Sequence, residues 1–134
     1  MAHNLSFFYE KNKIKIGKKL KEAIERGLSY KAKDYAEAID GIEDIYDGIK
    51  EIFHYVHGII TPSTTGIAPI GLANTGSPEF CTIWTFLGMP SISLPILKGL
   101  NNMPLGVQLV GEKNDDIRFL RSANWFLKKN KLIK

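Results

Sequence analysis

Residues 75–95 read TGSPEFCTIWTFLGMPSISLP, and residues 104–111 read PLGVQLVG. Residues 80–87 are mostly apolar and stop at Gly88, which predicts a short helix. Residues 91–97 predict a strand, and apolar residues alternate with others over 105–109 to predict a second one. The intervening Lys-Gly-Leu-Asn-Asn-Met segment is typical of a turn, so we expect the two strands to form a hairpin.

Upstream of this region, residues 58–61 read GIIT and predict a short buried strand that Pro62 stops. Residues 62–79 are rich in Pro, Gly, Ser, Thr and Asn and carry few charges, which predicts a long irregular loop. Loops of that length inside compact domains usually serve a site or lie beneath another element.

Three longer helices are expected. The first covers about residues 14–26, with Gly27 as its C-cap and Ser29 as the N-cap of the next helix. The second covers about residues 30–55 and is the clearest element, because apolar residues recur on one side at steps of three or four. Its other side carries acidic residues: Asp34, Glu37, Asp40, Glu43, Asp44, Asp47 and Glu51.

The last helix is predicted to begin at Asn114-Asp115-Asp116, because a capping residue and acidic groups suit the positive end of a helix dipole. We expect its buried stripe to contain Ile117, Leu120, Ala123 and Leu127. Lysines 128, 129 and 131 suit its negative end. Residues 1–13 give no clear pattern, so disorder is an open expectation there.

Composition limits the broad class. A chain of 134 residues is one domain at most, which we place over residues 1–134, and 44% hydrophobic with 24% charged residues is ordinary for a globular protein. No apolar run approaches the roughly 20 residues of a membrane span, and no signal-peptide pattern opens the chain. A single cysteine excludes an internal disulfide and fits a reducing compartment, so we expect the cytoplasm.

The net charge of +4 comes from basic segments at both ends, while residues 58–97 carry a single charged residue, Glu79. Basic ends can indicate nucleic-acid binding. Arginine is scarce, however, and no basic stripe is interleaved with aromatic residues. We therefore interpret the ends as solvated helix faces and expect neither a nucleic-acid nor a membrane partner.

The residues by themselves offer little catalytic chemistry. No Gly-x-Ser-x-Gly frame is present, and Ser63, Ser77, Ser91 and Ser93 lie in loop or strand settings. Cys81 with His54 or His57 could form a thiol–imidazole pair, although a buried structural thiol is the simpler interpretation. The acidic helix face could gather a metal, but no histidine or cysteine joins it, so a solvated face is expected.

Three short apolar strands cannot close a barrel, and a small open sheet leaves unpaired edges. Residues 59–60 and 92–97 have the composition of interior strands of a larger sheet. The sequence therefore predicts a chain that packs against something it does not contain, because its apolar face would otherwise be exposed.

Several ordered segments together carry a family resemblance: Thr61-Pro62-Ser63, Thr75-Gly76-Ser77-Pro78, Trp84 to Pro90, Ser93-Leu94-Pro95 and Leu105 to Gly111, followed by the Asp-initiated helix. This order resembles the final third of the amidase-signature hydrolases, over about residues 14–130. The resemblance implies an α/β fold with a large mixed sheet. This chain would supply a partial mixed sheet of about three short strands with flanking helices.

The resembled family hydrolyses amides through a serine, a second serine on a cis peptide bond, and a lysine. Its nucleophile lies in a Gly/Ser-rich stretch that this chain lacks, so the resemblance places no catalytic residue, metal or cofactor here. What it does place is one wall of a substrate cleft, around Glu79 to Phe86. The substrate-binding candidates are Trp84 and Thr85, with Cys81 one turn earlier; the alternative for Trp84 is an aromatic wedge in the core.

Two departures from the family pattern concern the pocket: His57-Gly58 stands where an acidic residue is common, and Pro62-Ser63 follows the strand. Three hypotheses remain open. The chain is a C-terminal amidase segment, inactive alone, whose N-terminal portion lies on another chain. It is instead a non-catalytic module that dimerises or binds a partner through its apolar sheet face. Or it is a hydrolase that uses Cys81 and a histidine. The resembled family includes enzymes that amidate aminoacyl-tRNA, and the sequence does not identify the parent enzyme's substrate.

Overall fold

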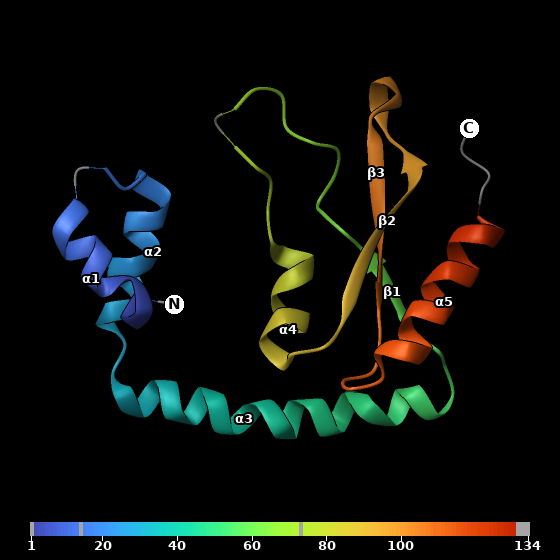
Figure 1. Ribbon diagram of the computed structural model, residues 1–134, viewed down its shortest axis with the longest axis horizontal. Helices are drawn as coiled ribbons and strands as arrows, with labels where there is room; N and C mark the ends of the chain where they lie inside the picture. The colour runs from blue at the N-terminus through green and yellow to red at the C-terminus, as the bar shows by residue number, and fades with distance from the viewer. Residues whose placement is uncertain (1, 14, 73, 131–134) are drawn as a thin grey trace. The chain divides into compact units, whose positions relative to one another are not determined.

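The computed structural model describes residues 2–13, 15–72 and 74–130 (Figure 1). In chain order its elements are α1 (Ala2–Asn12), α2 (Lys18–Ser29), α3 (Ala32–Lys50), the 3₁₀ turn η1 (Glu51–His54), β1 (Ile59–Pro62), α4 (Glu79–Leu87), β2 (Ser91–Lys98), the 3₁₀ turn η2 (Leu100–Asn102), β3 (Pro104–Val110) and α5 (Asp116–Lys129). The chain divides into two compact units, residues 1–41 and 42–134. The single domain expected over residues 1–134 stays a prediction, because this division does not say whether either unit folds alone.

The first unit begins with a helix that the sequence reasoning missed. Residues 1–13, where disorder was an open expectation, contain α1. The buried Tyr9 side chain anchors α1, because its hydroxyl donates a hydrogen bond to the carboxylate of Glu25 on α2. This hydrogen bond is the main reason that the pKa of Tyr9 is raised above its ordinary value of 10.0.

The limits of α2 differ from the prediction, in which Gly27 ended the helix and Ser29 began the next one. Gly27 lies inside α2, and a Cβ atom there would stand 2.5 Å from the Cβ of Ala2. Glycine therefore serves the close approach of α1 rather than a helix end. Ser29 instead donates its hydroxyl to the Arg26 carbonyl over 2.8 Å, and Ile14, the predicted start, lies outside the described residues.

The predicted long helix is observed as α3, which tightens into η1. Ile42, Tyr46 and Ile49 pack against a buried cluster that contains Phe53 of η1. The acidic side faces solvent, as predicted, with every one of its members exposed: Asp34, Glu37, Asp40, Glu43, Asp44, Asp47 and Glu51.

The sheet has the order β1-β3-β2, and both pairings are antiparallel. Val110 of the central strand pairs with Ile59 on one side and Ser91 on the other. The predicted hairpin is confirmed as β2 and β3, and the expected α/β class with three short strands is confirmed as well. A mixed sheet also needs parallel neighbours, which would come from strands outside this set of three.

The two faces of the sheet pack against different helices, since neighbouring side chains on a strand point to opposite sides. Val110 forms a core with Phe53, Leu87 and Met89 on the α4 side. Leu109, the preceding residue, packs on the other side against Phe119 and Ala123 of α5. Figure 1 shows α4 and α5 on opposite sides of the hairpin.

A glycine turn fixes the junction between α4 and β2. Gly88 adopts φ 69°, a left-handed conformation that suits glycine at a helix end. The Met89 N–H then donates to the Trp84 carbonyl over 3.0 Å, and the Gly88 N–H donates to the Thr85 carbonyl over 3.3 Å. The predicted helix over 80–87 is therefore confirmed with Gly88 as its stop.

The prediction that β1 is buried is wrong. Within this chain β1 is an edge strand, and Ile60 is 56% exposed. β2 is the other edge of the three-stranded sheet, so neither of the strands expected in the interior is flanked on both sides by this chain. The amino-acid composition reports a tendency to be covered, and the covering layer is not supplied by residues 42–72 or 74–130.

The start of α5 is confirmed, because the Asp115 carboxylate accepts the Arg118 N–H over 3.3 Å as an N-cap. The predicted buried stripe is mostly wrong: Ile117, Leu120 and Leu127 are exposed, whereas Phe119 and Ala123 are buried. The rotation of α5 is set by Phe119, whose ring stands where a Cβ on Gly111 would be, 2.5 Å from that position. Lys131, one of the predicted charges at the helix end, lies outside the described residues.

Candidate functional site

All three predicted substrate-binding residues lie on α4. Trp84 is half-buried and packs against the cluster of Phe53, Leu87, Met89 and Val110, which is the core-wedge position. Thr85 is exposed, and Cys81, one turn earlier, is partly buried. The helix thus holds Trp84 in the core and leaves Thr85 open to solvent, and the role of the three residues in binding stays a prediction.

Gln108 of β3 lies beneath the first turn of α4 and joins that turn to the sheet. Its side chain amide donates to the Phe80 carbonyl over 3.1 Å and to the Thr61 hydroxyl over 3.3 Å. Its oxygen accepts the Cys81 thiol at 3.5 Å, and the same thiol lies 3.5 Å from the Ser63 carbonyl. Gln108 is only 4% exposed, so these bonds form in a desolvated layer; we call this set, with Ser63 and Ser93, the polar seam.

The seam continues as a pair of serines. The hydroxyls of Ser63 and Ser93 are 2.7 Å apart and share one hydrogen bond, and Ser63 is buried. Gly106 lies against both: a Cβ atom at this position would stand 2.5 Å from the Ser93 hydroxyl and 2.8 Å from that of Ser63. The absence of a side chain at Gly106 therefore makes room for the serine pair.

The contacts of these groups do not form a nucleophile with its base. Serine or thiol chemistry needs a base within hydrogen-bond reach. Ser63 and Ser93 bond to each other, and the Cys81 thiol donates to two oxygens. His54 pairs instead with Glu51 at 3.7 Å, so these contacts lend no support to a hydrolase built on Cys81 and histidine.

A hollow of about 470 Å³ opens beside the seam. Thr61, Phe80 and Gly106 contribute to its wall together with the loop that follows β1 and with apolar side chains of the hairpin. The loop over residues 62–79 therefore lies at a concave surface, as long loops in compact domains often do. This hollow and the exposed side of α4 are the parts of the chain suited to contact a small molecule.

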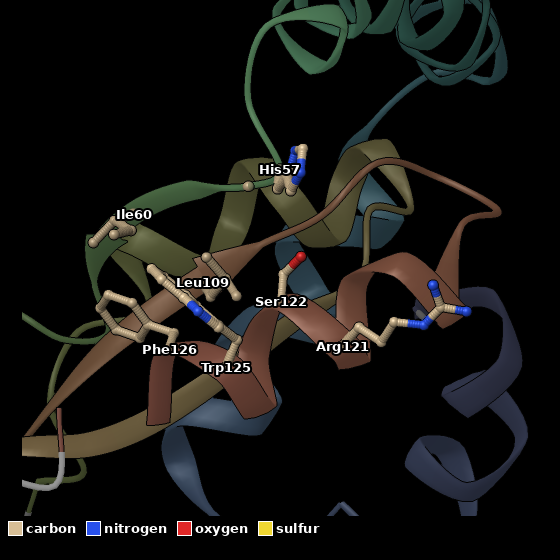
Figure 2. Close-up of a pocket in the computed structure, with 8 residues that line it drawn as sticks. His57, Ile60, Leu109, Arg121, Ser122, Trp125 and Phe126 are labelled. Atoms are coloured by element: carbon tan, nitrogen blue, oxygen red, sulfur yellow. The ribbon is translucent and has the colours of Figure 1, made fainter. Parts of the chain in front are cut away.

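A second hollow, of about 500 Å³, lies between β1 and α5 (Figure 2). Ile60 and Trp125 are 56% and 62% exposed, although both are large apolar side chains. In Figure 2 Trp125 lies beside Phe126, while the Arg121 side chain extends away from them. We call this surface the β1–α5 hollow; its lining residues are His57, Gly58, Ile60, Leu109, Arg121, Ser122, Trp125 and Phe126.

Sequence reasoning missed Gln108, although the sequence contains a signal for it. Gln108 is the one polar side chain among the apolar residues of the strand from Leu105 to Val110. A lone polar residue in a strand buried on both faces must find partners on the covering elements. Ser63 and Ser93 were considered only as nucleophiles, and their mutual hydrogen bond depends on the register of strands that are 30 residues apart.

Within residues 2–13, 15–72 and 74–130, no three histidine, cysteine, aspartate or glutamate side chains gather as metal ligands do. Over the same residues, none of the helices combines the length and the apolar character that crossing a bilayer requires.

The fold and the two surfaces are those of an amidase-like segment. A crystal structure described as an amidase matches with a TM-score of 0.83; the match covers 96% of this chain and 32% of that chain. The sequence identity is 22%, so this likeness shows the fold. It agrees with the predicted resemblance to the amidase-signature hydrolases.

At the level of sequence, the chain is similar to the mitochondrial glutamyl-tRNA(Gln) amidotransferase of Anopheles gambiae, in one of its component polypeptides. The two are 28% identical over 93 residues, which is 63% of this chain and 19% of the relative. The chain therefore spans less than a third of both proteins. No protein-family model matches it. Together the two matches confirm the predicted resemblance.

Proposed function

We propose that this chain is the C-terminal segment of an amide hydrolase and that it does not hydrolyse amides alone. The observation that carries the proposal is the match that covers 96% of this chain but only 32% of an amidase. The sequence has no Gly/Ser-rich stretch to hold a nucleophile, and Ser63 and Ser93 are engaged with each other. The segment supplies fold and binding surface, and the serine–serine–lysine chemistry comes from elsewhere.

Its contribution to catalysis is one wall of a substrate cleft. The exposed Thr85, the edge of Trp84 and the partly buried Cys81 stand on α4, and the hollow beside the polar seam adjoins the same helix through Phe80. A small amide would meet an apolar wall with a few hydroxyl and carbonyl groups, as binding sites commonly offer.

The partner in this proposal is the remainder of an amidase fold, carried on another polypeptide. It would dock on the edge of β1 and fill the β1–α5 hollow, where Ile60 and Trp125 are exposed. Burying such side chains contributes about 1.5–3 kcal/mol each, so this face favours a covering layer. We place the assembly in a reducing compartment such as the cytoplasm, since the single cysteine forms no internal disulfide.

The first experiment assays the purified chain on a panel of small amides and on glutamine. We expect no hydrolysis above the level of a boiled sample. Hydrolysis that co-purifies with the chain through two orthogonal columns and disappears in Cys81→Ser would contradict the proposal and support the thiol hypothesis instead.

The second experiment asks whether the segment can work in an amidase. The chain replaces the matched third of the amidase whose structure it resembles, either fused or co-expressed as a second polypeptide. We expect the truncated amidase to be inactive and the chain to restore measurable turnover. A chimera that folds, by its circular dichroism and its melting transition, yet stays inactive would count against the proposal.

The alternative function is a non-catalytic module that dimerises through the same apolar face. The exposure of Ile60 and Trp125 favours it, because monomers rarely leave such a patch open. A stable dimer in light scattering, combined with an inactive chimera, would select this alternative.

A further inference from the structure

The polar seam contains a side chain that joins three elements. Gln108 of β3 bonds to Thr61 on β1 and to Phe80 and Cys81 in the first turn of α4. Both amide hydrogens and the amide oxygen are used, and the donor–acceptor distances of the two N–H bonds are 3.1 and 3.3 Å. A glutamine amide that is satisfied in this way fixes a direction as well as a distance.

An apolar side chain of the same length would fill this space without requiring a partner. Burying an amide is costly unless its hydrogen bonds are made, so the net contribution of Gln108 to stability is modest. Its specific effect is to hold the Phe80 carbonyl and the Cys81 thiol at one place above β3. The other end of α4 is held separately, by Leu87 and Met89 in the core and by the Gly88 turn.

We propose that Gln108 is the positioning residue for the substrate-facing wall: it fixes the first turn of α4 on the sheet and thereby the presentation of Trp84 and Thr85. α4 has nine residues and no side-chain N-cap at Pro78, so its first turn depends on contacts with neighbouring segments. Releasing that turn would tilt the helix about its anchored C-terminal end. The assignment of substrate to this wall rests on the proposed function.

The chain carries a built-in reporter of this contact, because Cys81 is its single cysteine. We measure the rate at which an aromatic disulfide reagent modifies the thiol of the full chain under native conditions. Gln108→Met keeps the volume but removes the donors and the acceptor, so we expect modification about tenfold faster or more, as the loss of such bonds would predict. An unchanged rate would overturn the proposal.

Leu109→Ala provides the matched control, because Leu109 lies on the same strand but faces α5. It lowers the stability of the sheet without touching the seam, so its thiol rate should stay near that of the parent chain. Equal acceleration by Leu109→Ala and Gln108→Met would mean that the thiol reports global opening, and it would contradict the proposal.

Gln108→Glu tests the direction of the hydrogen bonds at constant shape. Near neutral pH the new carboxylate would face the Phe80 carbonyl as a second acceptor, so the thiol should be modified faster than in the parent chain. Burial raises the pKa of a carboxyl group, and the protonated form donates. The ratio of the two rates should therefore approach one as the pH falls. A pH-independent ratio would indicate a packing role and would overturn the proposal.

In the active chimera, Gln108→Met should raise KM by more than it lowers kcat, because the wall is displaced while the nucleophile is not. A fall in kcat at constant KM would mean loss of folded enzyme and would contradict the positioning role. An inactive chimera with the parent sequence would instead count against the proposed function, while the thiol measurements would still decide the role of Gln108.

Discussion

At the scale of single residues, close packing around Gly106 determines how the strands carry the polar seam. The serine hydroxyls on either side of it lie 2.7 Å apart, and an added Cβ would approach both within 2.8 Å. Ser63 also donates its backbone N–H to the Gly106 carbonyl over 3.2 Å. The hydroxyls therefore cannot move aside without disturbing the strand that holds them.

Gly106→Ala should lower the free energy of unfolding by about 1–3 kcal/mol, the usual cost of inserting a methyl group into a packed interior. Urea denaturation followed by circular dichroism measures the change. Gly106→Ala combined with Ser93→Ala should recover part of the loss, because the nearest atom is the Ser93 hydroxyl oxygen. A single variant as stable as the parent chain would show that the serine pair yields without cost.

At the scale of elements, an arginine connects α5 to the turn that ends α3. One Arg118 nitrogen donates to the carbonyls of Phe53 and Val56 over 2.8 and 3.0 Å. Carbonyls at the end of a helix lack partners within it, and a guanidinium supplies two donors in a fixed geometry. The same side chain lies 3.5 Å from Glu112 and 3.8 Å from Asp115.

Arg118→Met should destabilise the fold by about 1–2 kcal/mol, because the stem still packs while the two carbonyls lose their donor. Thermal melting at two salt concentrations checks this. Glu112→Gln is the control: it removes only a half-exposed ion pair and should change stability by less than about 0.5 kcal/mol. Equal effects of the two variants would assign the stabilisation to charge pairing instead.

At the scale of the molecule, the second unit leaves apolar side chains open where the sheet ends. The β1–α5 hollow is lined by large side chains beside an edge strand whose outer backbone groups have no partner strand among the described residues. Such an edge readily accepts another strand. This surface is the expected contact with the remainder of an amidase.

Trp125→Ser with Ile60→Thr should weaken that contact, whether the occupant is the amidase remainder or a second copy. Removal of two large side chains from a partner surface typically lowers affinity by a factor on the order of 10–1,000. Co-purification with the truncated amidase and light scattering of the chain alone measure the two cases. Leu120→Ser, an exposed position of α5 outside the hollow, should leave both unchanged; an equal effect there would indicate nonspecific adhesion.

The element types and most boundaries could be predicted because their signals are local. Asp115 caps α5, Gly88 ends α4, and alternating residues mark β3. The α1 helix was missed because its order depends on contact with α2 through Tyr9 and Glu25. Gln108 was missed because a polar residue in a strand gives a signal without naming its partners.

The sequence by itself determined the α/β class, the hairpin, the absence of a nucleophile frame and the resemblance to an amidase segment, since each rests on residue type and spacing. Only the tertiary structure decided which face of α5 is buried, that β1 is an edge with Ile60 exposed, and that Cys81, Ser63 and Gln108 meet. The physical reason is that burial and hydrogen bonding between distant segments depend on strand register and helix rotation. These are set by long-range packing, such as Phe119 against Gly111, and residue spacing along the chain does not encode them locally.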